Sequence, residues 1–133
     1  MFYRKGFFCG ELQLPKGIKI LSDNSIAICD SKNNRVQVFN ENGRYLYQFG
    51  GKGISNGQME SPYQIAIGPQ DTILVTEWNN HRVQVFSKEG QFLHCFGSKG
   101  NSEGNFVNPS GIAIAQTGHV IVCDAGNSCV QIF

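Results

Sequence analysis

One short pattern occurs three times in this chain of 133 residues, at a constant spacing of 47 residues. Residues 33–39 read Asn-Asn-Arg-Val-Gln-Val-Phe, residues 80–86 read Asn-His-Arg-Val-Gln-Val-Phe, and residues 127–133 form a more divergent third copy. Internal repeats with periods of about 20–50 residues are typical of proteins built from stacked supersecondary units. The period therefore constrains the fold more strongly than any other feature of the sequence.

Many other positions coincide when the sequence is aligned at this spacing. They include three prolines, three isoleucines and three acidic residues, namely Pro15, Pro62 and Pro109; Ile18, Ile65 and Ile112; and Asp30, Glu77 and Asp124. We therefore divide the chain into four segments. These are residues 1–14, which end a preceding repeat and its crossing loop, a first repeat at 15–61, a second at 62–108 and a truncated third at 109–133.

Each repeat has the periodicity of short β-strands rather than of helices. In the first repeat, short apolar or alternating runs predict strands at 18–21, 25–29, 35–39 and 44–49. Gly43 and Gly90 occupy the connection between the third and fourth strands, where a short hairpin favours a residue with left-handed backbone. Four antiparallel strands make up one propeller blade. The sequence therefore predicts an all-β protein, a β-propeller of four-stranded blades.

The repeated residues resemble the NHL repeat. The second copy shows this best, with an acidic residue at 77, Asn-His-Arg-Val-Gln-Val-Phe at 80–86, and Phe96-Gly97 after a turn glycine. The third copy departs from the pattern at Ser128 and Cys129. The resemblance covers the whole chain and implies a propeller commonly of six blades, of which about three are present. It is closest to the C-terminal NHL propellers of TRIM-type proteins (RING, B-box and coiled coil), in which a separate RING domain transfers ubiquitin.

The third repeat is incomplete. Three units of 47 residues need 141 positions, and the 133 present lack the equivalents of 40–47, a hairpin turn and most of an outer strand. Stacked repeats bury apolar faces against their neighbours. We therefore expect a segment of a larger propeller whose remaining blades come from a longer parent chain; the alternative is a ring closed by a second copy.

Composition gives no sign of a strongly charged or membrane-bound protein. The net charge is +1 and only 16% of residues are charged, so no global field favours nucleic acid or membrane. No apolar stretch reaches the roughly 20 residues needed to span a bilayer. Five cysteines at irregular spacings resemble neither a disulfide nor a zinc framework. We expect a cytoplasmic protein without a membrane partner.

Two arginines follow acidic residues at a fixed distance in the repeats. Asp30 precedes Arg35, and Glu77 precedes Arg82, by five positions. The structural interpretation is an ion pair that fixes the loop between the second and third strands. The functional alternative is an exposed arginine row that binds phosphate or a partner's carboxylates.

The best candidate binding surface consists of the loops that precede the third strands of the first two repeats. The candidate residues are Lys32, Asn33, Asn34, Arg35, Trp78, Asn79, Asn80, His81 and Arg82. Trp78 is the only tryptophan, and it either stacks a base or anchors a peptide, or lies flat on its own blade. Lys5, Lys52 and Lys99 recur in the crossing loops and form either a row along a phosphate backbone or ordinary solvated turns.

Catalysis has little support in the sequence. His81, His94 and His119 occupy different positions of the repeat and do not form a metal motif, so we expect no metal, no cofactor and no catalytic residue. The function expected is non-catalytic recognition of a protein partner or single-stranded RNA. The resemblance suggests that this is the substrate-selecting part of a TRIM-like E3 ubiquitin ligase, although the chain itself contains no RING. The alternative is a fragment of a metal-dependent, lyase-like NHL propeller.

Overall fold

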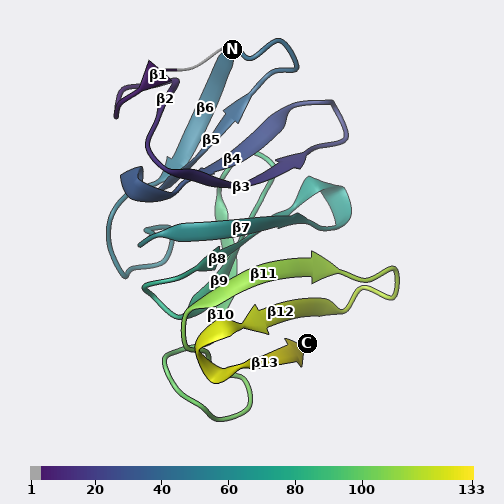
Figure 1. The fold of residues 1–133 in the computed structure, drawn as a ribbon. Coiled ribbons are helices and arrows are strands. Elements are labelled where there is room, and N and C mark those ends of the chain that lie inside the picture. The colour runs from purple at the N-terminus through teal and green to yellow at the C-terminus, as the bar shows by residue number, and fades with distance from the viewer. Residues whose placement is uncertain (1–3) are drawn as a thin grey trace.

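Each repeat forms one antiparallel sheet whose neighbouring strands follow one another in the sequence (Figure 1). The computed structural model describes residues 4–133, so the first three residues of the predicted segment 1–14 lie outside the described part. The first sheet consists of β3 (Pro15–Ile20), β4 (Ile26–Asp30), β5 (Arg35–Phe39) and β6 (Tyr45–Gly50). Two short strands that pair in parallel precede it, β1 (Arg4–Lys5) and β2 (Glu11–Leu12).

The second and third sheets repeat this arrangement. The second consists of β7 (Pro62–Ile67), β8 (Ile73–Glu77), β9 (Arg82–Phe86) and β10 (Phe92–Phe96). The third has only three strands, β11 (Pro109–Ile114), β12 (Val120–Asp124) and β13 (Cys129–Ile132), as the sequence predicts.

Helical structure within residues 4–133 is limited to three short 3₁₀ turns. These are η1 (Ser31–Asn33), η2 (Pro69–Asp71) and η3 (Ala125–Asn127). None of the helices in this described part is long and apolar enough to cross a membrane. The all-β prediction is therefore confirmed.

The first strands start earlier than the apolar pattern indicates. β3 begins at Pro15, which pairs with Asp30, and a bulge separates this pair from the regular ladder that starts at Ile18. Leu21, predicted to end the strand, instead lies in the following turn, where its amide donates to the carbonyl of Ser25. Hydrophobic periodicity does not reveal a pair that is separated from its ladder by a bulge.

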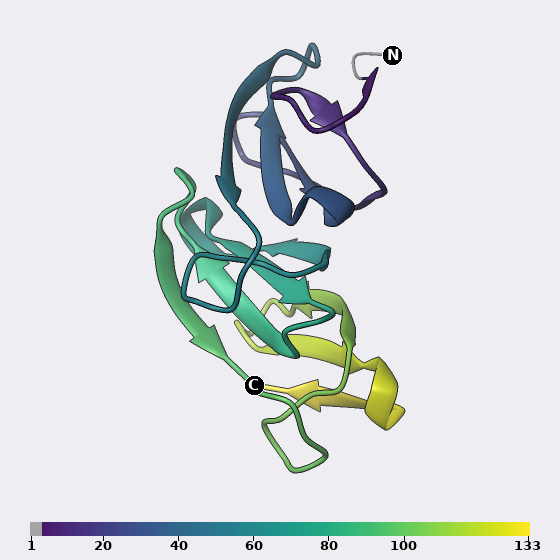
Figure 2. The same cartoon turned by 90° about the vertical axis from the view of Figure 1, so that its left-hand side faces the viewer.

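The three sheets stack so that β3, β7 and β11 are in contact in that order (Figures 1 and 2). Apolar side chains alternate along each strand, and one set from each sheet meets a set from the next. The core between the first two sheets includes Val36, Val38, Met59, Ile65, Val75 and Phe86. The core between the second and third sheets includes Ala66, Leu74, Val83, Phe106 and Val122.

The outward face of the third sheet is uncovered. Val130 on β13 is 58% exposed, whereas its repeat equivalents Val36 and Val83 are fully buried. Ile18 on β3 is exposed on the first sheet, while its equivalent Ile65 is buried against that sheet. These two faces match the unpartnered blade faces that the sequence predicts.

Candidate functional site

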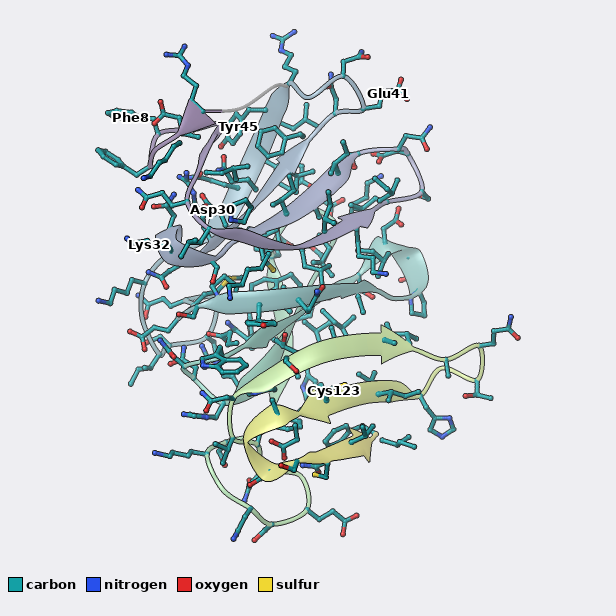
Figure 3. All side chains as sticks on the ribbon, in the orientation of Figure 1. Phe8, Asp30, Lys32, Glu41, Tyr45 and Cys123 are labelled. Atoms are coloured by element: carbon teal, nitrogen blue, oxygen red, sulfur yellow. The ribbon has the colours of Figure 1, made fainter. Side chains whose placement is uncertain are left out.

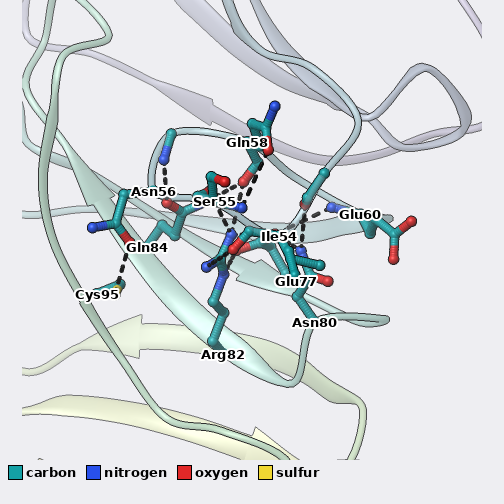
Figure 4. A network of polar contacts seen from close by, with 12 residues as sticks. Ile54, Ser55, Asn56, Gln58, Glu60, Glu77, Asn80, Arg82, Gln84 and Cys95 are labelled. Carbon is teal, nitrogen blue, oxygen red and sulfur yellow. Dashed lines mark hydrogen bonds and ion pairs between the residues drawn. The ribbon is translucent and has the colours of Figure 1, made fainter.

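A buried polar network fixes the crossing loop at 51–61 to the second sheet (Figure 4). Arg82 Nε lies 2.6 Å from Glu77 Oε2, and both side chains are buried. The other guanidinium nitrogens of Arg82 donate to the carbonyls of Ile54 at 2.8 Å, Ser55 at 3.1 Å and Gln58 at 2.9 Å. The guanidinium therefore joins strand β9 to three backbone positions of the loop.

The first repeat has a similar network that differs at one contact. Arg35 Nε lies 2.7 Å from Asp30 Oδ2, and its terminal nitrogens donate to the carbonyls of Phe8 and Glu11 and to the side chain of Gln48. The ion-pair interpretation of both arginines is confirmed. Since Arg35 and Arg82 are buried and already hold these partners, they do not form an exposed row.

The third repeat replaces the arginine with Cys129, whose thiol lies 3.8 Å from Asp124 Oδ2. Asp124 is still supplied with donors, because Asn127 Nδ2 lies 2.8 Å away, Gln131 Nε2 3.0 Å away and the amide of Val107 2.8 Å away. Burial opposes ionisation of Asp124, but these hydrogen bonds together hold the pKa of its carboxyl below the usual range. The crossing loop is thus held without an ion pair.

The asparagines of the candidate surface also serve the crossing loops. Asn33 Nδ2 donates to the carbonyl of Gly6 at 2.8 Å and to Asp30 at 2.9 Å. Asn80 Nδ2 makes the equivalent bonds, 2.9 Å to the carbonyl of Gly53 and 2.7 Å to the carboxylate of the second repeat. Both side chains therefore have a structural role in addition to any contact with a ligand.

Asn34 and His81 connect one repeat to the next. Both have left-handed backbone, with φ of 54° and 53°. Asn34 Oδ1 accepts from the amide of Ser61, and His81 Nδ1 accepts from the amide of Asn108, each at 3.0 Å. Burial, with a smaller contribution from Lys99, lowers the pKa of His81, which favours the neutral ring that can accept this bond.

Trp78 lies against its own blade. Its ring stacks on Tyr63 of β7, with centroids 5.0 Å apart and an interplanar angle of 23°. Lys16 Nζ lies 4.3 Å from the centroid of the same tyrosine ring. Asn79 is exposed and donates to the hydroxyl of Ser61 at 3.0 Å. The aromatic pair thus forms a fixed platform at the end of the second sheet, beside a lysine of the first.

This platform lines a surface pocket of about 530 Å³ between the first two repeats. The lining residues are Leu14, Lys16, Ser31, Lys32, Ser61, Tyr63 and Trp78. A second pocket of about 360 Å³ is lined by Lys5, Leu12, Gln13, Leu14, Pro15 and Lys32. Figure 3 shows Lys32 at the same side of the molecule as Asp30 and Phe8, far from Glu41. Leu14 and Lys32 line both pockets, and we call the two pockets together the Leu14 groove.

The structure brings together only part of the predicted surface and adds residues that sequence reasoning missed. Of the nine candidates, Lys32 and Trp78 line the groove, and Asn79 lies close to it; the others hold loops. The missed residues are Leu14, Lys16 and Tyr63. A signal for them was available, because these positions differ between repeats, with Lys16 equivalent to Tyr63 and Leu14 equivalent to Ser61.

Within residues 4–133, no group of three or more histidine, cysteine, aspartate or glutamate side chains is arranged to hold a metal ion. His94 is on β10 and His119 precedes β12, away from His81. The strongest arrangement for binding is therefore the Leu14 groove, with its lysines and its aromatic pair.

Comparison with family models gives a match to the NHL repeat at residues 12–39, 61–86 and 106–133. The matched residues make up more than half of the chain. The chain belongs to the NHL repeat family. The matched segments end with the third strands and contain both acid–arginine pairs, whereas the loop carbonyls that bind Arg82 lie just before the second segment.

Two curated proteins share similar stretches of sequence with this chain. RING finger protein nhl-1 of Caenorhabditis elegans is 51% identical over 51 residues, which are 38% of this chain and 5% of that protein. Protein brain tumor of Drosophila melanogaster is 36% identical over 45 residues, 34% of this chain and 4% of that protein. This NHL chain thus matches only a small part of either relative's length.

The fold is also found in solved structures of low sequence identity. Virginiamycin B lyase from Staphylococcus aureus, solved in a catalytically inactive form with quinupristin, superposes with a TM-score of 0.67 at 18% identity. The match covers 90% of this NHL chain and 40% of the lyase. This likeness confirms the β-propeller architecture of the NHL chain and, at that identity, carries no information on its chemistry.

Proposed function

We propose that this NHL chain is a non-catalytic recognition module that binds its ligand in the Leu14 groove. The observation that carries the proposal is that some loop side chains are used in internal hydrogen bonds while others are exposed in the groove. Asn33, Arg35, Asn80 and Arg82 are occupied in holding loops, whereas Lys32 is exposed and lines both pockets of the groove. Exposed loop residues on a rigid scaffold are disproportionately those that bind ligands.

The groove has the features of a macromolecular contact rather than of a small-molecule cavity. It lies open on the surface, crosses two repeats and combines lysines with an aromatic pair. The ligand classes that this favours are a protein segment and single-stranded RNA. By analogy with the RING finger named in nhl-1, the groove would select substrates for a TRIM-like E3 ligase to which such a chain belongs. We also place the protein in the cytoplasm, which its odd number of irregularly spaced cysteines favours.

The test is capture of protein and RNA from cytoplasmic extract on immobilised chain, with and without crosslinking. Lys32→Glu combined with Trp78→Ala should abolish the capture, while Lys99→Glu, in the crossing loop between the second and third sheets and outside the groove, should not. Thermal melting of each variant checks the fold. Equal recovery on all three proteins would refute the groove as the binding site, and recovery of nothing specific would refute the recognition function.

The ligase role needs a separate measurement in a longer parent protein that carries a RING domain. The double variant should lose ubiquitination of captured partners while autoubiquitination persists, because the proposed role of the groove is to bind the partner and not to transfer ubiquitin. Unchanged partner ubiquitination would refute substrate selection by this groove.

A further inference from the structure

Leu14 has a backbone conformation that leucine disfavours. Its φ is 49°, in the left-handed region, where Gly, Asn and Asp are tolerated far better than other residues. The repeat imposes this conformation, because the equivalent Ser61 and Asn108 have φ of 51° and 52°. Those two residues are polar and suit the position, whereas leucine gains no side-chain hydrogen bond there.

The leucine is also not explained by packing. Its side chain is 65% exposed, so it contributes little to the core, and it lines both pockets of the Leu14 groove. Residues held in sparsely populated backbone regions cluster at active sites and ligand clamps, where the surrounding structure fixes them. An exposed apolar side chain at a position that favours a polar residue thus indicates a contact with a ligand.

The charged side chains that line the Leu14 groove are all basic. The groove is lined by three exposed lysines, Lys5, Lys16 and Lys32, and by no carboxylate. Asp30, the carboxylate that pairs with Arg35 in the first repeat, is buried and does not line the groove. The lining of the groove therefore presents positive charge beside an apolar side chain, which is complementary to acidic groups that flank an apolar side chain.

We propose that the Leu14 groove binds an acidic peptide segment, with an apolar side chain packed on Leu14 and flanking carboxylates paired with the lysines. This inference rests on the proposed recognition function and specifies its partner. Peptide is favoured over single-stranded RNA because stacking of bases needs open aromatic faces. The two aromatic residues of the groove are instead half-buried and stacked on each other, with Lys16 over the tyrosine.

The decisive variant is Leu14→Asn, because its effects on fold and on binding have opposite signs. Asparagine tolerates left-handed backbone, so the variant should melt at a higher temperature than the parent. Loss of the apolar contact should weaken peptide binding by roughly tenfold or more. Leu93→Asn is the matched control, since Leu93 is 52% exposed on β10 and lines neither pocket. It should leave affinity unchanged.

Binding is measured by fluorescence anisotropy with three labelled probes. The first is a peptide pool with one leucine or phenylalanine among aspartates and glutamates, the second has alanine at the apolar position, and the third is a single-stranded RNA pool. We expect the first probe to bind most tightly, and its affinity to fall with rising salt, because the lysines are exposed.

Each other outcome counts against a stated part of the proposal. Tighter binding of RNA that Lys32→Glu abolishes would refute the peptide and leave the recognition function standing. Equal binding of the alanine pool, or unchanged affinity in Leu14→Asn, would refute the apolar contact. A lower melting temperature for Leu14→Asn would refute the strain. If no probe binds and the extract capture also fails, the recognition function itself is refuted.

Discussion

Replacing Arg82 with cysteine would give the second repeat the residue that the third repeat has at Cys129. Arg82 pairs at 2.6 Å with Glu77, whose side chain is fully buried, and donates to three carbonyls of the loop at 54–58. The variant removes all of these donors at once. It leaves a buried carboxylate without its cation and a crossing loop without its main attachment to β9.

The expected loss is a large part of the protein's stability. Removing one partner of a buried ion pair costs about 3–5 kcal/mol. Glu77 keeps hydrogen bonds from Asn80 at 2.7 Å and from the amide of Glu60 at 3.1 Å, which favours the lower end of this range, about 3 kcal/mol. For a domain of this size, the melting temperature should fall by roughly 10 °C.

Urea unfolding followed by circular dichroism measures this free energy, and calorimetry measures the melting temperature. Lys52→Cys, at an exposed position of the same loop, controls for the introduced thiol and should change the unfolding free energy by less than about 0.5 kcal/mol. Adding Glu77→Gln to Arg82→Cys should recover part of the loss, because no unpaired buried charge remains. A loss below about 1 kcal/mol for Arg82→Cys would refute the assignment of the arginine as the loop's clamp.

Three further predictions concern other positions of the repeat. Because the pKa of His81 is lowered in the folded protein, protonation of this ring favours the unfolded chain, and the parent should lose stability below about pH 6.5. His81→Asn should reduce this loss, measured as the difference between melting temperatures at pH 7.5 and 5.5. An unchanged pH dependence would contradict this. Val83→Lys should cost at least about 3 kcal/mol in urea unfolding, whereas Val130→Lys, at the exposed equivalent position, should cost less than about 1 kcal/mol; equal losses would show that Val130 is covered. Cys129→Arg should raise the unfolding free energy by about 1 kcal/mol by pairing with Asp124, and a decrease would contradict the equivalence of the repeats.

The fold was predictable because the same pattern of strand residues occurs in three segments of the sequence. Alternation along one strand is ambiguous over four or five residues, but the run at 35–39 recurs at 82–86 and both are strands. The acidic residue and arginine at a spacing of five also recur, which made an ion pair the natural interpretation. The strand that starts at Pro15 was placed too late because its first pair is separated by a bulge that leaves no apolar signature.

The groove was less predictable because it forms between repeats. Residues at the same position of consecutive repeats lie on neighbouring blades. Lys16 therefore lies beside Tyr63, which has the equivalent position in the second repeat. The surface predicted from the sequence joined the loops before the third strands of two neighbouring blades, but it left out the first strands, on which Lys16 and Tyr63 lie. The carbonyls that accept from Asn33 and Asn80 could not be predicted for another reason. They belong to glycine-rich crossing loops, in which no alternation of apolar residues indicates the path of the backbone.

The third repeat shows why such a scaffold can specialise its surface. Cys129 replaces the arginine, yet three other donors still satisfy Asp124 and the loop keeps its path, with Lys99 bridged to Phe106 as Lys52 is to Met59. Because each loop is held by several buried bonds, loss of one residue does not decide its shape. Positions that contribute nothing to those bonds, such as Leu14, are then free to depart from what the backbone prefers. Under the proposed recognition function, binding in the Leu14 groove compensates for a departure that the fold disfavours.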